Sequence, residues 1–162
     1  MSSVAKPPEP TGAERHWRAL ESLYESAPVN RLFDSALQID EPGRARINFT
    51  IDEKFHHAAG AAHGTIYFKM LDDAAFYAAN TLVTDRFLLT TSFNLHFTAP
   101  IRNGQVIAEG RWISGRRRVF VAESRLLTPD GEEIGRGTGT FMRSRIALSS
   151  LQGYAEALMP RA

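Results

Sequence analysis

The sequence predicts an α+β fold in which an antiparallel sheet packs against one central helix. Three observations lead to this prediction. Apolar residues recur at helical spacing near the N-terminus, a long apolar segment occupies residues 56–80, and apolar and polar residues alternate through most of the remaining chain. We therefore expect a strand or two, then the long segment, then four successive strands.

Composition restricts the class of protein. The 162 residues have the length of one domain, which can bury about 70% of the surface of its unfolded chain. With 19 basic and 18 acidic residues, the chain lacks the strong positive charge of a nucleic-acid-binding protein. The absence of cysteine excludes disulfides, thiol catalysis and cysteine-bound metal. No apolar run has the length of a signal peptide or a membrane span, so we expect a soluble, cytoplasmic protein.

The N-terminal region is expected to contain an arm and one helix. Residues 1–12 are rich in proline and small polar residues, which favour a flexible arm ahead of a single domain at residues 13–162. From Ala13 to Ala27 the apolar side chains follow helical spacing, and Pro28 ends the pattern. We expect this amphipathic helix to pack on the domain, and a second short helix to follow Ser149.

Period-two alternation predicts the strands. In residues 44–51 the apolar side chains occupy every second position, as in a half-buried strand. Further strands are expected in residues 91–97, 105–113, 118–127 and 133–142. Glycine, asparagine and aspartate in the connections between the later strands favour antiparallel turns. In the last strand Gly135, Gly137 and Gly139 share one face, where they either admit another backbone closely or make a weak, twisted edge strand.

The central segment predicts a helix that is buried on nearly every side, because its apolar residues cover most of the circumference. Lys69 and Asp73 stand four residues apart on the remaining stripe, which indicates an ion pair. Asp72 lies off that stripe among apolar residues, where an ionised carboxylate is costly unless a cleft uses it or a partner neutralises it. Asp72 is therefore the candidate catalytic residue.

The start of this helix, in the sequence GAAHGT, has glycine and small residues where the first turn leaves backbone N–H groups without partners. Such groups attract negative charge, and a donor aimed at an oxyanion contributes about 3 to 4 kcal/mol to the transition state of acyl transfer. The alternative is an ordinary glycine-containing loop in which His63 is a hydrogen-bonded polar neighbour.

These segments carry a resemblance to a known family. HAAGAAHGTIYFKMLDDAAFYAAN, then TTSFNLHFTAP, then the landmarks GQV, PDG and TGTF resemble the hotdog-fold acyl-CoA thioesterases, of the phenylacetate-pathway type within the 4-hydroxybenzoyl-CoA thioesterase superfamily. The resemblance extends from about Ile47 to Arg143. It implies a hotdog fold, an antiparallel sheet wrapped around one long central helix, here with an added N-terminal helix.

The resemblance also assigns candidate site residues. It places His63 and Gly64 at the start of the central helix and Asp72 nine residues after the histidine. His57 stands where the family has an asparagine, and Thr65 stands where it has a second glycine. The resemblance further implies that Thr90 faces the site from a strand and helps to hold a water molecule.

By this resemblance the chain hydrolyses an acyl-CoA thioester, with CoA as part of the substrate and neither cofactor nor metal. The carbonyl would point at the Gly64 N–H, and Asp72 would act as general base or, alternatively, as nucleophile. The two halves of the site would come from different subunits of a homodimer, which can pair further into a tetramer. Phe68 and Phe76 would line the acyl pocket. Arg116, Arg117 and Arg118 form a basic turn that would contact the nucleotide phosphates or would be a solvated loop.

Three other functions compete with hydrolysis. The histidines near Asp72 in sequence could bind a metal, although their spacing matches no recognised metal site. The protein could bind acyl-CoA or acyl-carrier protein without turnover. His57 and Thr65 favour this alternative, because they replace the asparagine and the second glycine of the family. A hotdog hydratase would add water to an enoyl thioester, although its aspartate would be expected on a loop before the helix.

Overall fold

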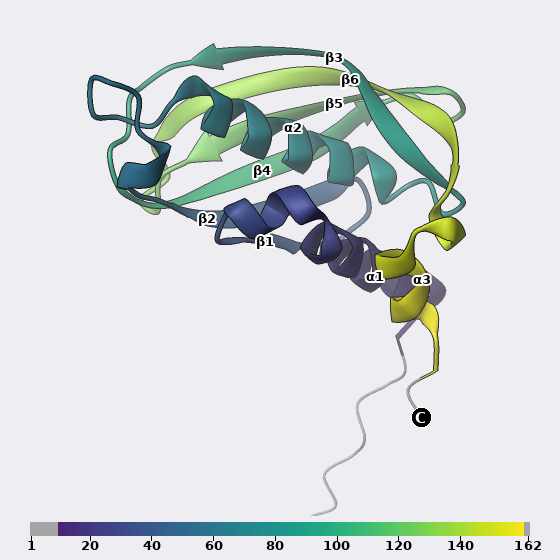
Figure 1. Cartoon of the computed structure of the whole chain (residues 1–162). Helices are drawn as coiled ribbons and strands as arrows, with labels where there is room; N and C mark the ends of the chain where they lie inside the picture. Colours follow the sequence, from purple (N-terminus) through teal and green to yellow (C-terminus); the bar gives the residue numbers. More distant parts are fainter. Residues whose placement is uncertain (1–9, 161–162) are drawn as a thin grey trace, which may run out of the picture.

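The computed structural model describes residues 10–160 (Figure 1). The first nine residues of the expected arm lie outside this range. The helices are α1 (Gly12–Ser26), α2 (Gly64–Asn80) and α3 (Gln152–Leu158), with single 3-10 turns at Pro28–Leu32, Glu53–Phe55 and Leu148–Ser150. The strands are β1 (Ser35–Gln38), β2 (Arg44–Ile51), β3 (Arg86–Phe97), β4 (Gly104–Ser114), β5 (Val119–Leu127) and β6 (Glu133–Ala147).

The six strands form one antiparallel sheet in the order β1-β2-β4-β5-β6-β3. Figure 1 shows this sheet curving around α2, with α1 and α3 side by side at one end. The predicted α+β architecture is confirmed, including the added N-terminal helix. One or two strands were expected before the central helix, and the structure has two. The strand at residues 44–51 is β2, and β1 is an additional strand before it whose four residues are too few to show a clear alternation.

Helix α1 begins and ends where local signals place it. Thr11 accepts a hydrogen bond from the Glu14 N–H and Glu14 bonds back to the Thr11 N–H, which makes a capping box. The helix ends at Ser26, two residues before Pro28. The prediction of residues 13–27 is therefore shifted by one residue.

The core lies between α2 and the concave face of the sheet. Met70, Leu71, Ala74, Ala75 and Ala78 are completely buried, as the sequence predicted for this helix. Gly110 of β4 allows the close approach, because a Cβ atom there would stand 1.9 Å from the Ala74 carbonyl oxygen. No other residue type fits without a shift of backbone.

The glycines of β6 make room for a side chain. The sequence suggested two other roles for them, the close approach of another backbone or a weak, twisted edge strand. Strand β6 lies between β5 and β3, so the interpretation as an edge strand is wrong. A Cβ at Gly137 or Gly139 would stand 2.4 or 2.5 Å from the ring of Phe93. These glycines make room for an aromatic ring of the neighbouring strand. The Asn94 carbonyl oxygen of that strand also stands 3.0 Å from the Cβ position of Gly137, whereas the closer approach of a helix backbone occurs at Gly110.

Helices α1 and α3 are joined to the end of α2 through one buried histidine. His16 Nδ1 lies 2.7 Å from the Tyr154 hydroxyl, and His16 Nε2 lies 2.9 Å from the Asn80 carbonyl oxygen. Burial lowers the pKa of His16 below its ordinary value. Among the described residues, no helix has both the length and the apolar character needed to cross a membrane.

Candidate functional site

Asp72 lies on α2 and borders a cavity of about 270 Å³, which we call the Asp72 hollow. Its other walls come from the end of α1, the turn after it and the first half of β3. Asp72 makes no salt bridge within residues 10–160, and its one side-chain hydrogen bond comes from the Thr90 hydroxyl, 3.0 Å from Oδ1. Burial raises the pKa of Asp72 to about 6, although the Thr90 hydrogen bond opposes this rise. The carboxylate therefore has the properties of a general base near neutral pH.

Asp73 has the structural role that the sequence predicted. It forms an ion pair with Lys69, whose Nζ also donates a hydrogen bond of 2.6 Å to the Asn30 side chain. Lys69 lies over the rings of Tyr24 and Phe33 as well. This cluster fixes the turn after α1 against α2, and it leaves Asp72 without a counter-ion.

A bulge in β3 directs Thr90 toward Asp72. Regular alternation from Phe93 would place Thr91 and Leu89 on the side facing α2. The register with β6 shifts between Thr90 and Ser92, which reverses the alternation beyond that point. Leu88 is consequently buried and Leu89 is exposed. The sequence contains no signal for this bulge, so the position of Thr90 came only from the family resemblance.

The N-terminus of α2 borders a different cavity of about 420 Å³, which we call the Gly64 hollow. His57, Gly64, Tyr67 and the residues from Phe97 to Pro100 form part of its walls. Within the described residues the Gly64 N–H donates no hydrogen bond. It is therefore available to an acceptor that enters the hollow.

The two candidate histidines take part in local hydrogen bonds. His63 is the N-cap of α2, since its Nδ1 accepts from the Thr65 N–H at 3.1 Å and lies 3.0 Å from the Thr65 hydroxyl. This is the satisfied polar neighbour that the sequence offered as an alternative. His57 Nδ1 accepts from the Ala59 N–H at 3.0 Å, which fixes the loop before the helix.

One subunit does not bring the two halves of the candidate site together. Gly64 and Asp72 are eight residues apart on one helix, which corresponds to about 12 Å along its axis. They also border separate hollows. A thioester carbonyl cannot contact both within a single chain.

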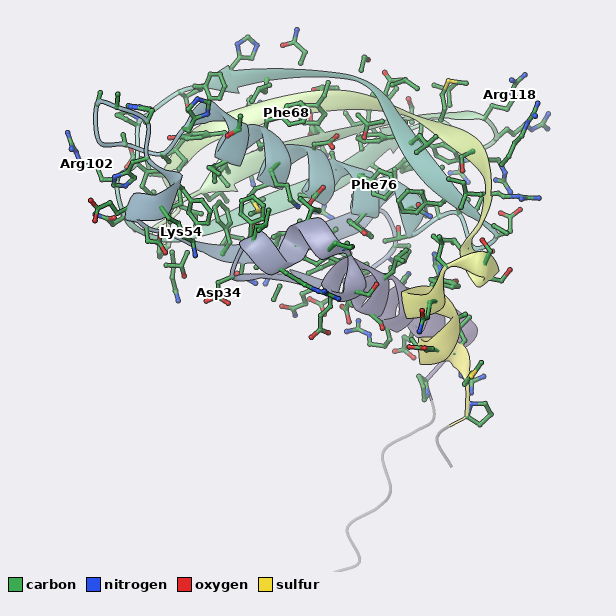
Figure 2. All side chains as sticks on the ribbon, in the orientation of Figure 1. Asp34, Lys54, Phe68, Phe76, Arg102 and Arg118 are labelled. Atoms are coloured by element: carbon green, nitrogen blue, oxygen red, sulfur yellow. The ribbon has the colours of Figure 1, made fainter. Side chains whose placement is uncertain are left out.

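The other expected substrate residues lie in three places. Phe76 borders the Asp72 hollow, and its ring packs against Phe87 with centroids 5.0 Å apart. Phe68 is exposed and packs edge-on against Phe93, outside that hollow. The turn of Arg116, Arg117 and Arg118 lies at the end of the sheet opposite Arg102, as the labelled Arg118 shows in Figure 2. Arg116 lies over the Trp112 ring, 5.2 Å from its centroid.

Several walls of the Asp72 hollow have no signal in the sequence. Tyr24 and Asn30 come from the N-terminal region, and Tyr77, Phe87 and Leu89 come from the end of α2 and the start of β3. A helical projection would place Tyr77 next to Asp73, but no pattern in the chain indicates that α1 covers this part of α2. Residues 10–160 contain no group of three histidine, aspartate or glutamate side chains arranged to hold a metal ion.

The architecture and the position of the helix define the class of protein, a hotdog fold. Residues 59–134 match the family model described as the thioesterase superfamily. This segment is similar to the thioesterase superfamily, and the resemblance found in the sequence is confirmed. The match contains α2, β3, β4 and β5, and it leaves out α1 and α3.

Solved structures share this fold. The E. coli PaaI protein, from the phenylacetic acid degradation operon, is 15% identical and superposes with a TM-score of 0.77, covering 85% of this chain and 99% of that one. A thioesterase family protein from Silicibacter pomeroyi is 25% identical with a TM-score of 0.72, covering 80% and 97%. A thioesterase from Haemophilus influenzae is 15% identical with a TM-score of 0.70, covering 85% and 92%. A comparison with curated proteins gives no match.

Proposed function

We propose that this protein hydrolyses an acyl-CoA thioester to the free acid and CoA, with Asp72 as the general base. The observation that carries the proposal is a carboxylate on the central helix that borders a hollow, makes no salt bridge within residues 10–160 and has a pKa raised to about 6. The match of residues 59–134 to the thioesterase superfamily model supports thioester hydrolysis as the reaction class. The similarity to PaaI makes an aromatic acyl group one substrate to test.

The proposed reaction needs a base and an oxyanion donor. Water adds to the thioester carbon while Asp72 accepts its proton, and the carbonyl oxygen becomes an oxyanion that the Gly64 N–H stabilises. The intermediate then collapses, the carbon–sulfur bond breaks and CoA leaves as a thiolate. Thr90 holds the Asp72 carboxylate in position and lowers its pKa. Direct attack by Asp72 on the thioester carbon would expel CoA as a thiolate and form a mixed anhydride. Hydrolysis of that anhydride at the aspartyl carbonyl, in a single turnover in ¹⁸O-water, would leave label in the aspartate.

A homodimer would bring the base and the donor together. The sheet has two edge strands, β1 and β3, and β3 is twelve residues long with Leu89 and Phe97 exposed. Thr90 marks the Asp72 end of β3, whereas the Phe97 ring lies over Gly64 at the other end. Antiparallel pairing of two β3 strands about a two-fold axis near Phe93 and Asn94 would therefore place Asp72 beside the partner's Gly64 hollow. The Arg116–Arg118 turn of one subunit could approach only the Gly64 hollow of the other subunit, and not the Gly64 hollow of its own chain.

Engineered cysteines test this arrangement, because the natural chain contains none. We expect Asn94→Cys to form a disulfide-linked dimer on mild oxidation, since symmetric residues near a two-fold axis come within disulfide range. The matched control is Gln38→Cys on the other edge strand, β1. Equal crosslinking of the two variants, or none at residue 94 in a protein that is dimeric in solution, would contradict the proposed interface.

Asp72→Asn tests the proposed reaction, with Asp73→Asn as the control that removes a carboxylate from the same turn. A thiol-detecting assay with a panel of acyl-CoA thioesters should show a loss of at least about a hundredfold for Asp72→Asn. Asp73→Asn should retain most of the turnover. Binding of acyl-CoA without turnover by the natural protein would instead favour the non-catalytic alternative.

A further inference from the structure

We infer that the acyl chain extends past the Asp72 hollow into a second apolar cavity between α1 and α3. This inference rests on the proposed thioesterase function. The second cavity, which we call the terminal-helix hollow, has a volume of about 510 Å³ and lies between α1, α3 and the end of β6. Figure 1 shows the two helices together at this end of the sheet.

The two hollows are neighbours that share three walls. Ala27, Tyr77 and Phe87 border both of them. Ala27 is the C-cap residue that follows α1, and Phe87 belongs to β3 three residues before Thr90. A chain whose carboxyl carbon lies beside Asp72 would therefore reach the terminal-helix hollow by passing between Ala27 and Phe87.

The lining of the terminal-helix hollow suits a hydrocarbon chain. Leu23, Ile146 and Leu151 are apolar walls, and the polar residues Arg31, Gln152 and Glu156 are exposed to solvent. Gln152 donates a hydrogen bond of 2.7 Å to Glu156, so these polar groups are in part paired with each other. The volume lies in the range of about 300 to 1,000 Å³ that is typical of small-molecule sites. The chemical class that fits is a medium-length or long acyl chain, or an aryl group with an apolar extension.

Blocking the junction tests this inference. Ala27→Phe would place a ring between the two hollows, and its backbone hydrogen bond to the Tyr24 carbonyl oxygen does not depend on the side chain. Leu23→Trp would fill only the terminal-helix hollow. Ala13→Phe is the matched control, because Ala13 lies exposed on the same helix and borders neither hollow.

The variants are compared on butanoyl-, octanoyl-, dodecanoyl- and hexadecanoyl-CoA, with circular dichroism as a check of folding. We expect Ala27→Phe to lower kcat/KM for the longer chains at least about tenfold more than for butanoyl-CoA, since each methylene lost from an apolar site costs about tenfold or more. Leu23→Trp should affect only the longest chains that the natural protein accepts. The inference would be overturned if Ala27→Phe and Leu23→Trp were folded and their kcat/KM values depended on chain length in the same way as those of the Ala13→Phe control. Absence of turnover of every thioester by the natural protein would instead overturn the proposed function.

A second inference concerns Tyr77 and rests on a different observation. Tyr77 is only 6% exposed, yet its hydroxyl makes no hydrogen bond within residues 10–160. Within residues 10–160, every side-chain nitrogen or oxygen atom that is fully buried has a hydrogen-bond partner. Because the Tyr77 hydroxyl has no partner, its oxygen must be part of the small surface of Tyr77 that remains accessible. Because Tyr77 borders both hollows, we propose that its hydroxyl binds an oxygen atom carried by the acyl chain at the junction.

Tyr77→Phe removes this hydroxyl and keeps the ring. The test uses acyl-CoA thioesters that carry a hydroxyl group at successive carbons, each compared with the unsubstituted chain. We expect the natural protein to prefer one hydroxylated isomer, and Tyr77→Phe to lower kcat/KM for that isomer at least about tenfold, as for a site that loses a substrate hydrogen bond. Tyr77→Phe should lower kcat/KM for the unsubstituted chain much less than for that isomer. Equal effects of Tyr77→Phe on both kinds of chain would contradict the assignment.

Discussion

The Thr90 hydroxyl donates a 3.0 Å hydrogen bond to the Asp72 carboxylate across the gap between β3 and α2. It is the one side-chain hydrogen bond that Asp72 receives within the described residues, and it favours the ionised form. We expect Thr90→Val to raise the pKa of Asp72 and to shift the acid limb of the kcat/KM profile to higher pH. The measurement is a pH–rate profile with Thr91→Val as the control. Unchanged limbs in both variants would show that the bond has no influence on the base.

The natural protein should lose activity in acid. Burial raises the pKa of Asp72 to about 6, and the base must be ionised to accept a proton from water. We therefore expect kcat/KM to fall about tenfold for each pH unit well below 6. A profile that stays flat to pH 5 in a protein that remains folded would exclude Asp72 as the base.

Asp72→Asn should be more stable than the natural protein at neutral pH. The folded-state pKa of Asp72 is raised, so folding becomes less favourable as pH increases from about 4 to 6, and the ionised carboxylate is a constant cost above that range. We expect a higher Tm for Asp72→Asn at pH 8 and no difference near pH 4. Asp73→Asn, which removes the partner of Lys69, should lower Tm at pH 8.

Gly64→Pro removes the proposed oxyanion donor and little else. Gly64 is the first residue of α2, where proline is tolerated, and His63 before it has the extended backbone that a following proline requires. We expect Gly64→Pro to lower kcat at least about a hundredfold. Gly64→Ala is the control, because it adds the same Cβ beside Phe97 and keeps the N–H. Equal losses in both variants would attribute the effect to crowding.

Mixing inactive variants tests whether sites are shared. A dimer with one Asp72→Asn subunit and one Gly64→Pro subunit would contain one site with both defects and one site with neither. We expect co-refolded mixtures to regain activity, up to about half of the natural value per heterodimer. Mixtures that stay as inactive as the separate variants would place both residues of each site in the same chain.

Most of the fold could be predicted because it depends on local patterns. The alternation in residues 44–51 and the burial of α2 follow from hydrophobic periodicity, and both are confirmed. The Lys69–Asp73 ion pair follows from helical spacing. Gly110 and the bulge beside Thr90 could not be predicted, because each depends on how two distant elements meet.

The candidate site was predictable only in part. Asp72 was distinguished by its position among apolar residues, and the structure shows it beside a hollow as that argument required. The walls from α1 were missed, because periodicity shows which face of a helix is buried but not what it covers. The Tyr77 hydroxyl could not be recognised as unpaired, since the sequence does not list the neighbours of a side chain.

The open edge of β3 has a consequence for the life of a newly made subunit. One side of a twelve-residue strand presents backbone N–H and C=O groups that no strand within residues 10–160 covers. While they are uncovered, these groups can join any extended segment nearby, including one from an unfolded copy. If the proposed dimer forms through β3, correct pairing and aggregation compete for the same surface during synthesis.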